Sequence, residues 1–87
     1  MYHFEFDEQK SASNLRKHGI DFITAQELWS DSELIEIKAK SHAEPRYLIV
    51  ARVAGKHWSA VVTYRGDVIR LISVRRSRKP EVQLCES

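Results

Sequence analysis

The chain has 87 residues, of which 43% are hydrophobic and 30% charged, and this composition indicates one folded domain over residues 1–87 rather than a disordered chain. The single cysteine, Cys85, excludes an internal disulfide and any zinc site built on several cysteines, and it fits a cytoplasmic protein. Neither a signal peptide nor a membrane span is expected, since no apolar run approaches about 18 residues.

The net charge of +2 hides an uneven distribution along the chain. Residues 1–36 carry eight acids against three bases, a net charge of −5, whereas residues 37–87 carry eleven bases against four acids, a net charge of +7. A small protein with such a basic half is expected to bind a polyanion. Charge alone does not tell whether this partner is RNA, DNA or an acidic protein.

The first expected element is a short strand over 2–7, where aromatic residues alternate with polar ones. A helix over 8–18 should follow. Asp7 is expected to cap its start, because a carboxylate accepts hydrogen bonds from the free N–H groups of a first turn, and Gly19 can adopt the left-handed conformation that ends a helix. The packing contacts of this helix are predicted to be its two apolar residues, Ala12 and Leu15.

A second helix is expected over 22–30, with Asp21 as its cap, because apolar residues recur there at helical spacing. Segments rich in β-branched and aromatic residues, separated by glycine turns, then predict four strands, and Pro80 is expected at the first position of a final short helix. These five elements are expected over 34–40, 46–55, 57–65, 68–76 and 80–86.

Together the elements predict an α+β fold: a compact antiparallel sheet of four to five strands, with two N-terminal helices and a short C-terminal helix packed on one face. In the strand over 68–76, simple alternation places Arg70 on one side and Arg75 on the other. Residues 65–79 hold six bases and one acid. Like charges this dense repel one another, so an anion is expected near them.

Three sequence motifs, taken together, are shared with one protein family. F-x-x-D-x-x-K spans 4–10, N-x-x-K-H-G-I-x-F spans 14–22, and I-R-x-I-S-x-R-R spans 69–76. In this order they resemble the BrnT toxins, ribonucleases of bacterial type II toxin–antitoxin systems, which are similar in fold to the RelE toxins. The resemblance implies RNA cleavage, inhibition of translation, and a hetero-oligomer with a BrnA-like antitoxin. Because that antitoxin binds operator DNA, contact with DNA would be indirect.

The end of the chain departs from the family pattern. Cys85 stands where relatives often carry an aromatic residue, and Pro80 stands where further cations are common. Glu81 either pairs with Arg75 or Arg76, or caps the start of this helix, and the sequence leaves both alternatives open.

Metal-independent cleavage of RNA requires a base that activates the ribose 2′-hydroxyl, an acid for the leaving oxygen, and cations for the charge that grows on the phosphoryl oxygens. Arginine suits the last role, since its planar fork donates two parallel hydrogen bonds and stays charged. Arg70, Arg75 and Arg76 are expected to be catalytic, with at least two of them at one phosphate. Arg78 and Lys79 should bind neighbouring phosphates. The alternatives are solvated surface charge and contact with the antitoxin.

His18 is the candidate for proton transfer, because an imidazole titrates near neutral pH, although a cation at a helix C-terminus also stabilises without catalysis. Lys17 beside it either binds phosphate or is solvated. Tyr64 either contacts RNA, by stacking on a base or donating to phosphate, or belongs to the core. No cofactor or metal site is expected, since the four histidines lack ligand spacing, and His3 and His42 are expected at the surface.

Two functions of different classes therefore remain. The first is a metal-independent endoribonuclease toxin, and the second is a non-catalytic module that binds RNA or an acidic protein. Only the first requires the guanidinium groups at the end of the last strand to converge with His18 around one phosphodiester. In that case the antitoxin is expected to cover these cations.

Overall fold

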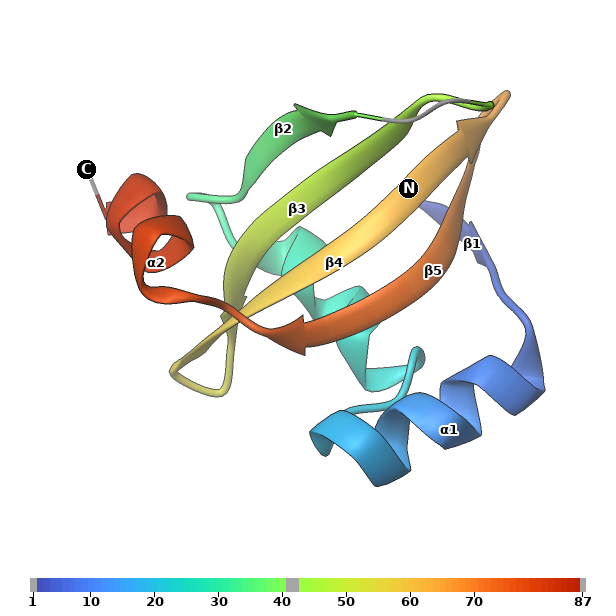
Figure 1. Cartoon of the computed structure of the whole chain (residues 1–87), viewed down its shortest axis with the longest axis horizontal. Helices are drawn as coiled ribbons and strands as arrows, with labels where there is room; N and C mark the ends of the chain where they lie inside the picture. Colours follow the sequence, from blue (N-terminus) through green and yellow to red (C-terminus); the bar gives the residue numbers. More distant parts are fainter. Residues whose placement is uncertain (1, 41–42, 87) are drawn as a thin grey trace.

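The computed structural model describes residues 2–40 and 43–86, so His42 lies outside the described residues (Figure 1). It confirms the α+β class. Over the described ranges, no helix is long and apolar enough to cross a membrane. The elements are β1 His3–Glu5, α1 Glu8–His18, the 3₁₀ helix η1 Thr24–Ser30, β2 Ile35–Ala39, β3 Arg46–Val53, β4 Lys56–Arg65, β5 Val68–Arg76 and α2 Lys79–Glu86.

Five strands form one sheet in the order β1-β5-β4-β3-β2. Strands β2 to β5 form the expected antiparallel meander, but β1 runs parallel to β5, with His3 opposite Val68 and Glu5 opposite Arg70. The prediction of a wholly antiparallel sheet is therefore wrong at this edge. Alternation of residue types indicates the two faces of a strand, but not its neighbour or its direction.

The two faces of the sheet are covered differently. The face toward η1, here called the core face, holds the buried hydrophobic cluster, and the opposite face, here called the open face, carries α2 at one end (Figure 1). Glu81 of α2 accepts a hydrogen bond from Ser59 at 2.8 Å, and the Cys85 sulfur lies 4.0 Å from the Val50 carbonyl oxygen. The helices thus lie on both faces, and the prediction of one covered face is wrong.

The segment expected as a second α-helix over 22–30 is instead the shorter 3₁₀ helix η1. The buried side chains of 22–30 are Phe22, just before η1, and Ala25 and Leu28 within it, and they recur at intervals of three residues. That interval matches the three residues per turn of a 3₁₀ helix and lines these side chains up against the core face. The residue directly before η1 is Ile23 rather than the predicted cap Asp21, but the Asp21 carboxylate does accept a hydrogen bond from the N–H of Thr24, the first residue of η1, at 2.7 Å.

Helix α1 has the predicted caps but not the predicted packing. Asp7 accepts from the Gln9 N–H at 2.8 Å, and Gly19 ends the helix with φ 82°. The side chains that α1 buries are polar, Ser11 and Asn14, whereas its apolar residues are exposed, with Leu15 49% accessible. The expectation that Ala12 and Leu15 form the packing contacts of α1 is therefore wrong.

Asn14 attaches α1 to the sheet edge that β1 leaves uncovered. Its side-chain amide donates to the Val74 carbonyl at 2.8 Å and accepts from the Val74 N–H at 3.1 Å, which replaces the two bonds of a neighbouring strand. The same amide donates to the Ile20 carbonyl at 2.8 Å. Three buried backbone groups depend on this one side chain, and this contact sets the position of α1 beside β5.

Asn14→Ala should lower the free energy of unfolding by about 2–4 kcal/mol, because it leaves buried N–H and C=O groups without a partner. Urea denaturation followed by circular dichroism measures this loss. Arg16→Ala is the matched control, since Arg16 is exposed on the same helix, and it should change the free energy by less than about 0.5 kcal/mol. A similarly small change for Asn14→Ala would contradict the role given to this amide.

Candidate functional site

A β-bulge interrupts the middle of β5. Val61 of β4 pairs with Ser73, while the next residue, Val62, pairs with Leu71, so Ile72 is an extra residue with no opposite partner. An extra residue reverses the alternation of side chains beyond it and bends the strand. The bulge therefore decides which cations of β5 share a face.

Arg70 and Arg75 lie together on the open face because of this bulge. Arg70 pairs with Thr63 and Arg75 pairs with Ser59, two residues of β4 that share one face. The simple alternation that separated the two arginines is therefore wrong. Five residues of strand span about 16 Å, so the two guanidinium groups are spaced for different phosphates rather than for one.

Arg76 lies on the core face. It pairs with Trp58 across the ladder, and its guanidinium carbon sits 5.4 Å from the centre of the Trp58 ring. A guanidinium over an indole face gains a cation–π attraction. The structure therefore places Arg75 and Arg76, which are neighbours in the sequence, on different faces of the sheet.

A hollow of about 200 Å³ lies between α1 and the bulge of β5. Lys10 and Lys17, seven residues apart, lie on the same side of α1 two turns from each other, and His18 ends the helix. No carboxylate lines this hollow, so its charge favours an anion. The residues that line it, here called the basic hollow, are Lys10, Ser13, Asn14, Lys17, His18, Ile72 and Ser73.

The basic hollow brings together two of the residues predicted from the sequence, Lys17 and His18, with five that were not predicted. Lys10 could have been found from its seven-residue spacing to Lys17. Ser13 carried no comparable signal, and Ser73 reaches the hollow at the bulge, which no pattern in the sequence reveals. The hydroxyl groups of both serines can donate hydrogen bonds to an anion.

Arg75 is held by Glu81 of α2. Its two terminal nitrogens donate to the two carboxylate oxygens at 2.8 and 2.7 Å, a bidentate pair that raises the pKa of Arg75. Glu81 also accepts from the Ser59 hydroxyl and from the Arg78 N–H, each at 2.8 Å. Both roles left open for Glu81 are therefore present, the ion pair and the helix cap.

The environment of Glu81 favours its charged form. The hydrogen bonds from Arg75 are the largest cause, and those from the Arg78 N–H and the Ser59 hydroxyl add to them, so the pKa of the Glu81 carboxyl falls to about 2 despite its partial burial. The bonds of this carboxylate join the end of β5 to the first turn of α2.

Tyr64 lies on the core face, away from Arg70 and Arg75. It pairs with Ile69, a buried residue, and its ring stands 5.1 Å from that of Tyr47. Its hydroxyl donates to Glu36, and burial, followed by this bond, raises the pKa of Tyr64. The structure thus places Tyr64 in an aromatic contact at the far end of β4 from Arg76.

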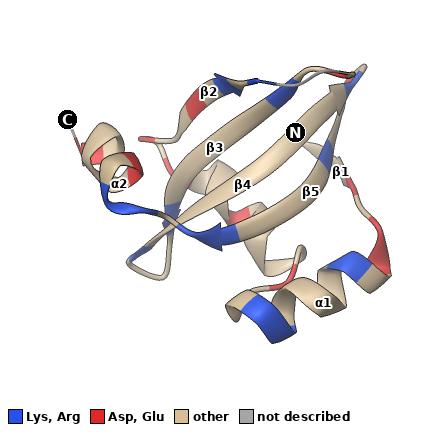
Figure 2. Ribbon diagram, in the orientation of Figure 1, with Lys and Arg blue, Asp and Glu red and all other residues tan. Residues whose placement is uncertain are grey.

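Arg78 and Lys79 follow β5 at the start of α2, and both side chains are exposed. Figure 2 shows basic segments on α1, along β5 and in this connection. The described cations therefore extend from the basic hollow past the end of β5, although they do not meet at one point.

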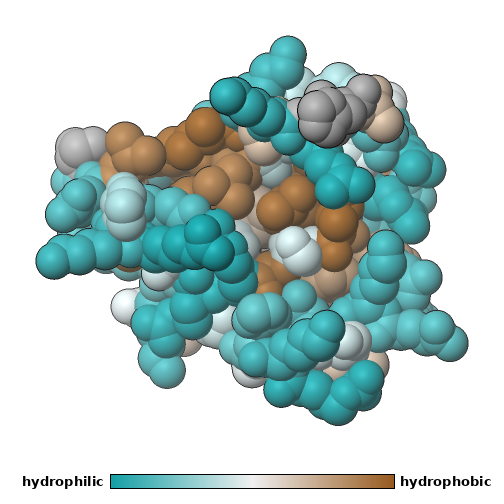
Figure 3. All heavy atoms as spheres, viewed as in Figure 1, coloured by the Kyte–Doolittle hydropathy of each residue, from teal (hydrophilic) through white to brown (hydrophobic). Residues whose placement is uncertain are grey.

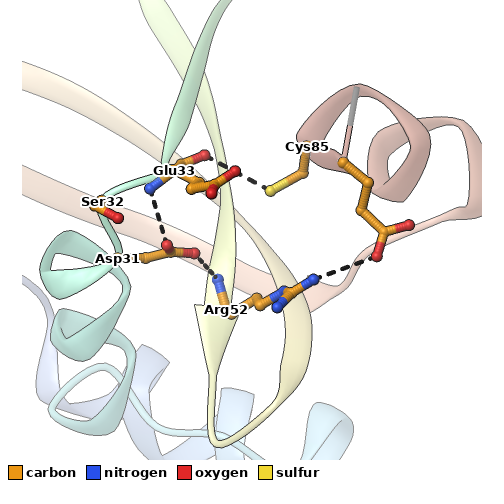
Figure 4. Close-up of a pocket in the computed structure, with 6 residues that line it drawn as sticks. Asp31, Ser32, Glu33, Arg52 and Cys85 are labelled. Atoms are coloured by element: carbon orange, nitrogen blue, oxygen red, sulfur yellow. Dashed lines mark hydrogen bonds and ion pairs between the residues drawn. The ribbon is translucent and has the colours of Figure 1, made fainter.

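A second, larger hollow of about 420 Å³ lies between α2 and the loop before β2 (Figure 4). Three carboxylates and one guanidinium line it, and the Asp31 carboxylate accepts from the N–H groups of Glu33 and Arg52 at 2.9 and 2.8 Å. Arg52 pairs with Glu86 at 3.3 Å, and burial raises the pKa of the Cys85 thiol. Its excess of negative charge makes this hollow a poor site for phosphate.

The described residues contain no group of three or more His, Cys, Asp or Glu side chains that could hold a metal ion. The fold and the basic hollow define a small α+β protein with a cationic site at the edge of its sheet. The model of a family described as "Ribonuclease toxin, BrnT, of type II toxin-antitoxin system" matches residues 6–81.

The chain therefore belongs to this family of ribonuclease toxins, as its motifs indicated, and RNA and an antitoxin are its substrate and partner by that membership. No curated protein matches the chain.

Acid should destabilise this protein partly through Glu81. Because its pKa falls from an ordinary 4.5 to about 2 on folding, its contribution is complete above about pH 4.5 and is lost between there and about pH 2. Glu81→Gln should lower the free energy of unfolding at neutral pH by about 1–3 kcal/mol and flatten its dependence on pH in this window.

Urea denaturation at a series of pH values measures both effects. Glu86→Gln is the control, because the pair of Glu86 with Arg52 is exposed, and it should leave the pH dependence nearly unchanged. An unchanged slope for Glu81→Gln would contradict the assignment.

Proposed function

We propose that this toxin is a metal-independent endoribonuclease that cleaves RNA in the basic hollow. The observation that carries the proposal is the grouping of two lysines, one histidine and two serine hydroxyls around a hollow without a carboxylate. Such a set can hold a phosphodiester and exchange protons with it, because it supplies cations, hydrogen-bond donors and an imidazole together.

In the proposed reaction, the ribose 2′-hydroxyl attacks the adjacent phosphorus and the 5′-oxygen of the next nucleotide leaves. His18 either takes the proton of the 2′-hydroxyl as base or gives a proton to the leaving 5′-oxygen as acid, and water completes the other transfer. Lys10 and Lys17 stabilise the charge that grows on the phosphoryl oxygens, and Ser13 and Ser73 orient those oxygens through their hydroxyls.

Arg70 and Arg75 flank the hollow along β5. They stand three and two positions from Ser73, or about 10 and 7 Å along the strand, so they are spaced to bind the neighbouring phosphates. Arg78 and Lys79 continue this track. Catalytic roles for Arg70, Arg75 and Arg76 remain predictions, and the contact of Arg76 with Trp58 favours packing, as the Tyr47 contact does for Tyr64.

The wider setting of the proposal comes from the family. We infer that cleavage inhibits translation in the cytoplasm, that a BrnA-like antitoxin neutralises the toxin in a hetero-oligomer, and that DNA is contacted only through this antitoxin. The likeness of the fold to RelE toxins belongs to the same inference. It is consistent with a five-stranded sheet flanked by helices.

The second candidate is a module that binds RNA or an acidic protein without cleaving anything. The pairing of Arg75 with Glu81 favours it, because a guanidinium that is already occupied is less free to stabilise a reaction. The two candidates differ in one outcome, the fate of RNA incubated with the purified protein in EDTA. Intact RNA with tight, salt-dependent binding would favour the module.

His18→Ala should reduce the rate of RNA cleavage in EDTA by about 100-fold or more, because positioned proton transfer contributes on that scale. A gel assay with a labelled RNA measures the rate. Arg16→Ala is the matched control, since Arg16 is an exposed cation in the same helical turn that does not line the hollow. Equal rates for the His18→Ala variant and the wild type would remove the imidazole from the reaction.

Lys10→Ala should weaken RNA binding. It should also make the slope of the logarithm of the association constant against the logarithm of the salt concentration shallower by about 0.7, the value for one contact to a phosphate of single-stranded RNA. Fluorescence anisotropy at several salt concentrations measures this slope. Lys56→Ala provides a comparison, because Lys56 is an exposed lysine at the start of β4, outside the hollow. If both variants changed the slope equally, the basic hollow would have no special part in binding.

A further inference from the structure

A band of aliphatic side chains crosses the open face of the sheet. Ile37 of β2 pairs with Leu48 of β3, Leu48 pairs with Val61 of β4, and Ile72 stands at the bulge of β5 beside them. Ile35 extends the band along β2, and all five side chains remain partly exposed. These residues, here called the apolar band, are Ile35, Ile37, Leu48, Val61 and Ile72.

The band is visible as a hydrophobic area across the middle of this face, with hydrophilic residues on both sides (Figure 3). Isolated apolar residues on a surface are ordinary, but a continuous patch rimmed by polar groups indicates a binding site. Helix α2 covers only the neighbouring end of the face, where Cys85 packs near Val50.

The composition of the band favours a protein segment over RNA. Unpaired bases are bound chiefly by stacking on aromatic rings or on guanidinium planes. All eight aromatic side chains of the chain lie elsewhere: six belong to or pack against the core cluster, Tyr2 contacts Phe4, and Tyr64 contacts Tyr47. Aliphatic side chains without an aromatic platform suit the apolar residues of a polypeptide.

Charge along the band defines the partner further. Arg46 and Arg70 follow the band on one side, where Arg46 pairs with Ala39 of β2 and Arg70 pairs with Thr63 of β4. Among the described residues, the one carboxylate near Arg70 is that of Glu5, at a long 3.7 Å, so the guanidinium can donate to a better-placed carboxylate. On the other side Arg75 is already neutralised by Glu81. Of these three arginines, only Arg75 is held closely by a carboxylate of the described residues.

We propose that the apolar band, with Arg46 and Arg70, is the docking surface for an amphipathic segment of the antitoxin. The segment would place apolar side chains on the band and Asp or Glu side chains toward the two arginines. This assignment rests on the proposed function in one respect, that the antitoxin neutralises a nuclease. A segment lying there passes beside Ser73 at the mouth of the basic hollow, which explains how it would block RNA.

Isothermal titration of the purified toxin with its cognate antitoxin tests the surface. Leu48→Glu, at the centre of the band, and Arg46→Glu, at its exposed border, should each weaken binding by about tenfold or more, because each removes a favourable contact and adds repulsion toward an acidic segment. Ile23→Glu is the control, because Ile23 is 67% exposed and directly precedes η1, on the other side of the sheet from the apolar band. It should leave the affinity for the antitoxin unchanged within about twofold.

Wild-type affinity in both the Leu48→Glu and the Arg46→Glu variants would overturn the proposal, as would a loss confined to Ile23→Glu. If Leu48→Glu bound the antitoxin normally but lost RNA, the band would serve RNA and the proposal would fall. Circular dichroism checks that each variant folds. If Leu48→Glu does not fold, Arg46→Glu and protection of the amides of Ile37, Leu48 and Val61 from hydrogen exchange in the wild-type complex decide the question.

The nuclease assignment is tested separately with the wild-type protein in the RNA assay. Absence of cleavage, together with antitoxin binding that depends on Leu48, would overturn the enzyme and leave the docking surface intact. Cleavage together with unchanged antitoxin binding by the Leu48→Glu and Arg46→Glu variants would support the enzyme and overturn the docking surface.

Discussion

The amide of Asn14 is the contact on which the arrangement of the site depends. The sheet has an incomplete edge, because β1 pairs with only the first three residues of β5. Asn14 completes that edge at Val74 and holds the Ile20 carbonyl with the same group. Without it, α1 would have no polar attachment there, and its apolar residues could not replace one, since they face solvent.

The bulge in β5 provides the other half of the arrangement. It gives the strand an extra residue at Ile72, beside the helix that Asn14 attaches, so that residues 72 and 73 line the hollow opposite Lys17 and His18. The same bulge moves Arg75 to the face of Arg70 and leaves Arg76 over Trp58. One inserted residue thus sets which cations RNA could meet on a single face.

Features encoded locally could be predicted from the sequence, and features that depend on distant partners could not. Asp7 and Gly19 cap α1 as expected, because a cap needs only the neighbouring backbone. Asn14 looked like one polar residue among others on an exposed helix, since its partner Val74 is sixty positions away. The parallel pairing of β1 with β5 could not be predicted for the same reason, because it joins residues that are far apart in the sequence.

The residues of the candidate site also fall into those that could be predicted from the sequence and those that could not. Lys17 and His18 were identifiable from their residue types at a helix end, and Lys10 was within reach through its spacing. Ser73, the separation of Arg75 from Arg76, and the placement of Tyr64 on the core face depend on register. Assigning faces by alternation assumes an uninterrupted ladder. The bulge breaks this alternation within β5, so the faces predicted for the residues beyond it, including Arg75 and Arg76, are wrong.

The bonds of Glu81 have a consequence for how α2 responds to anions. The same carboxylate holds Arg75 and accepts a hydrogen bond from the Arg78 N–H at the first turn of α2, so an anion that displaces Glu81 from its place also weakens the cap of the helix. Ligand occupancy at the end of β5 and the order of the C-terminal turn are therefore linked equilibria. The linkage is reciprocal: whatever frays α2 increases the affinity of Arg75 for phosphate, and whatever clamps α2 in place decreases it by the same factor.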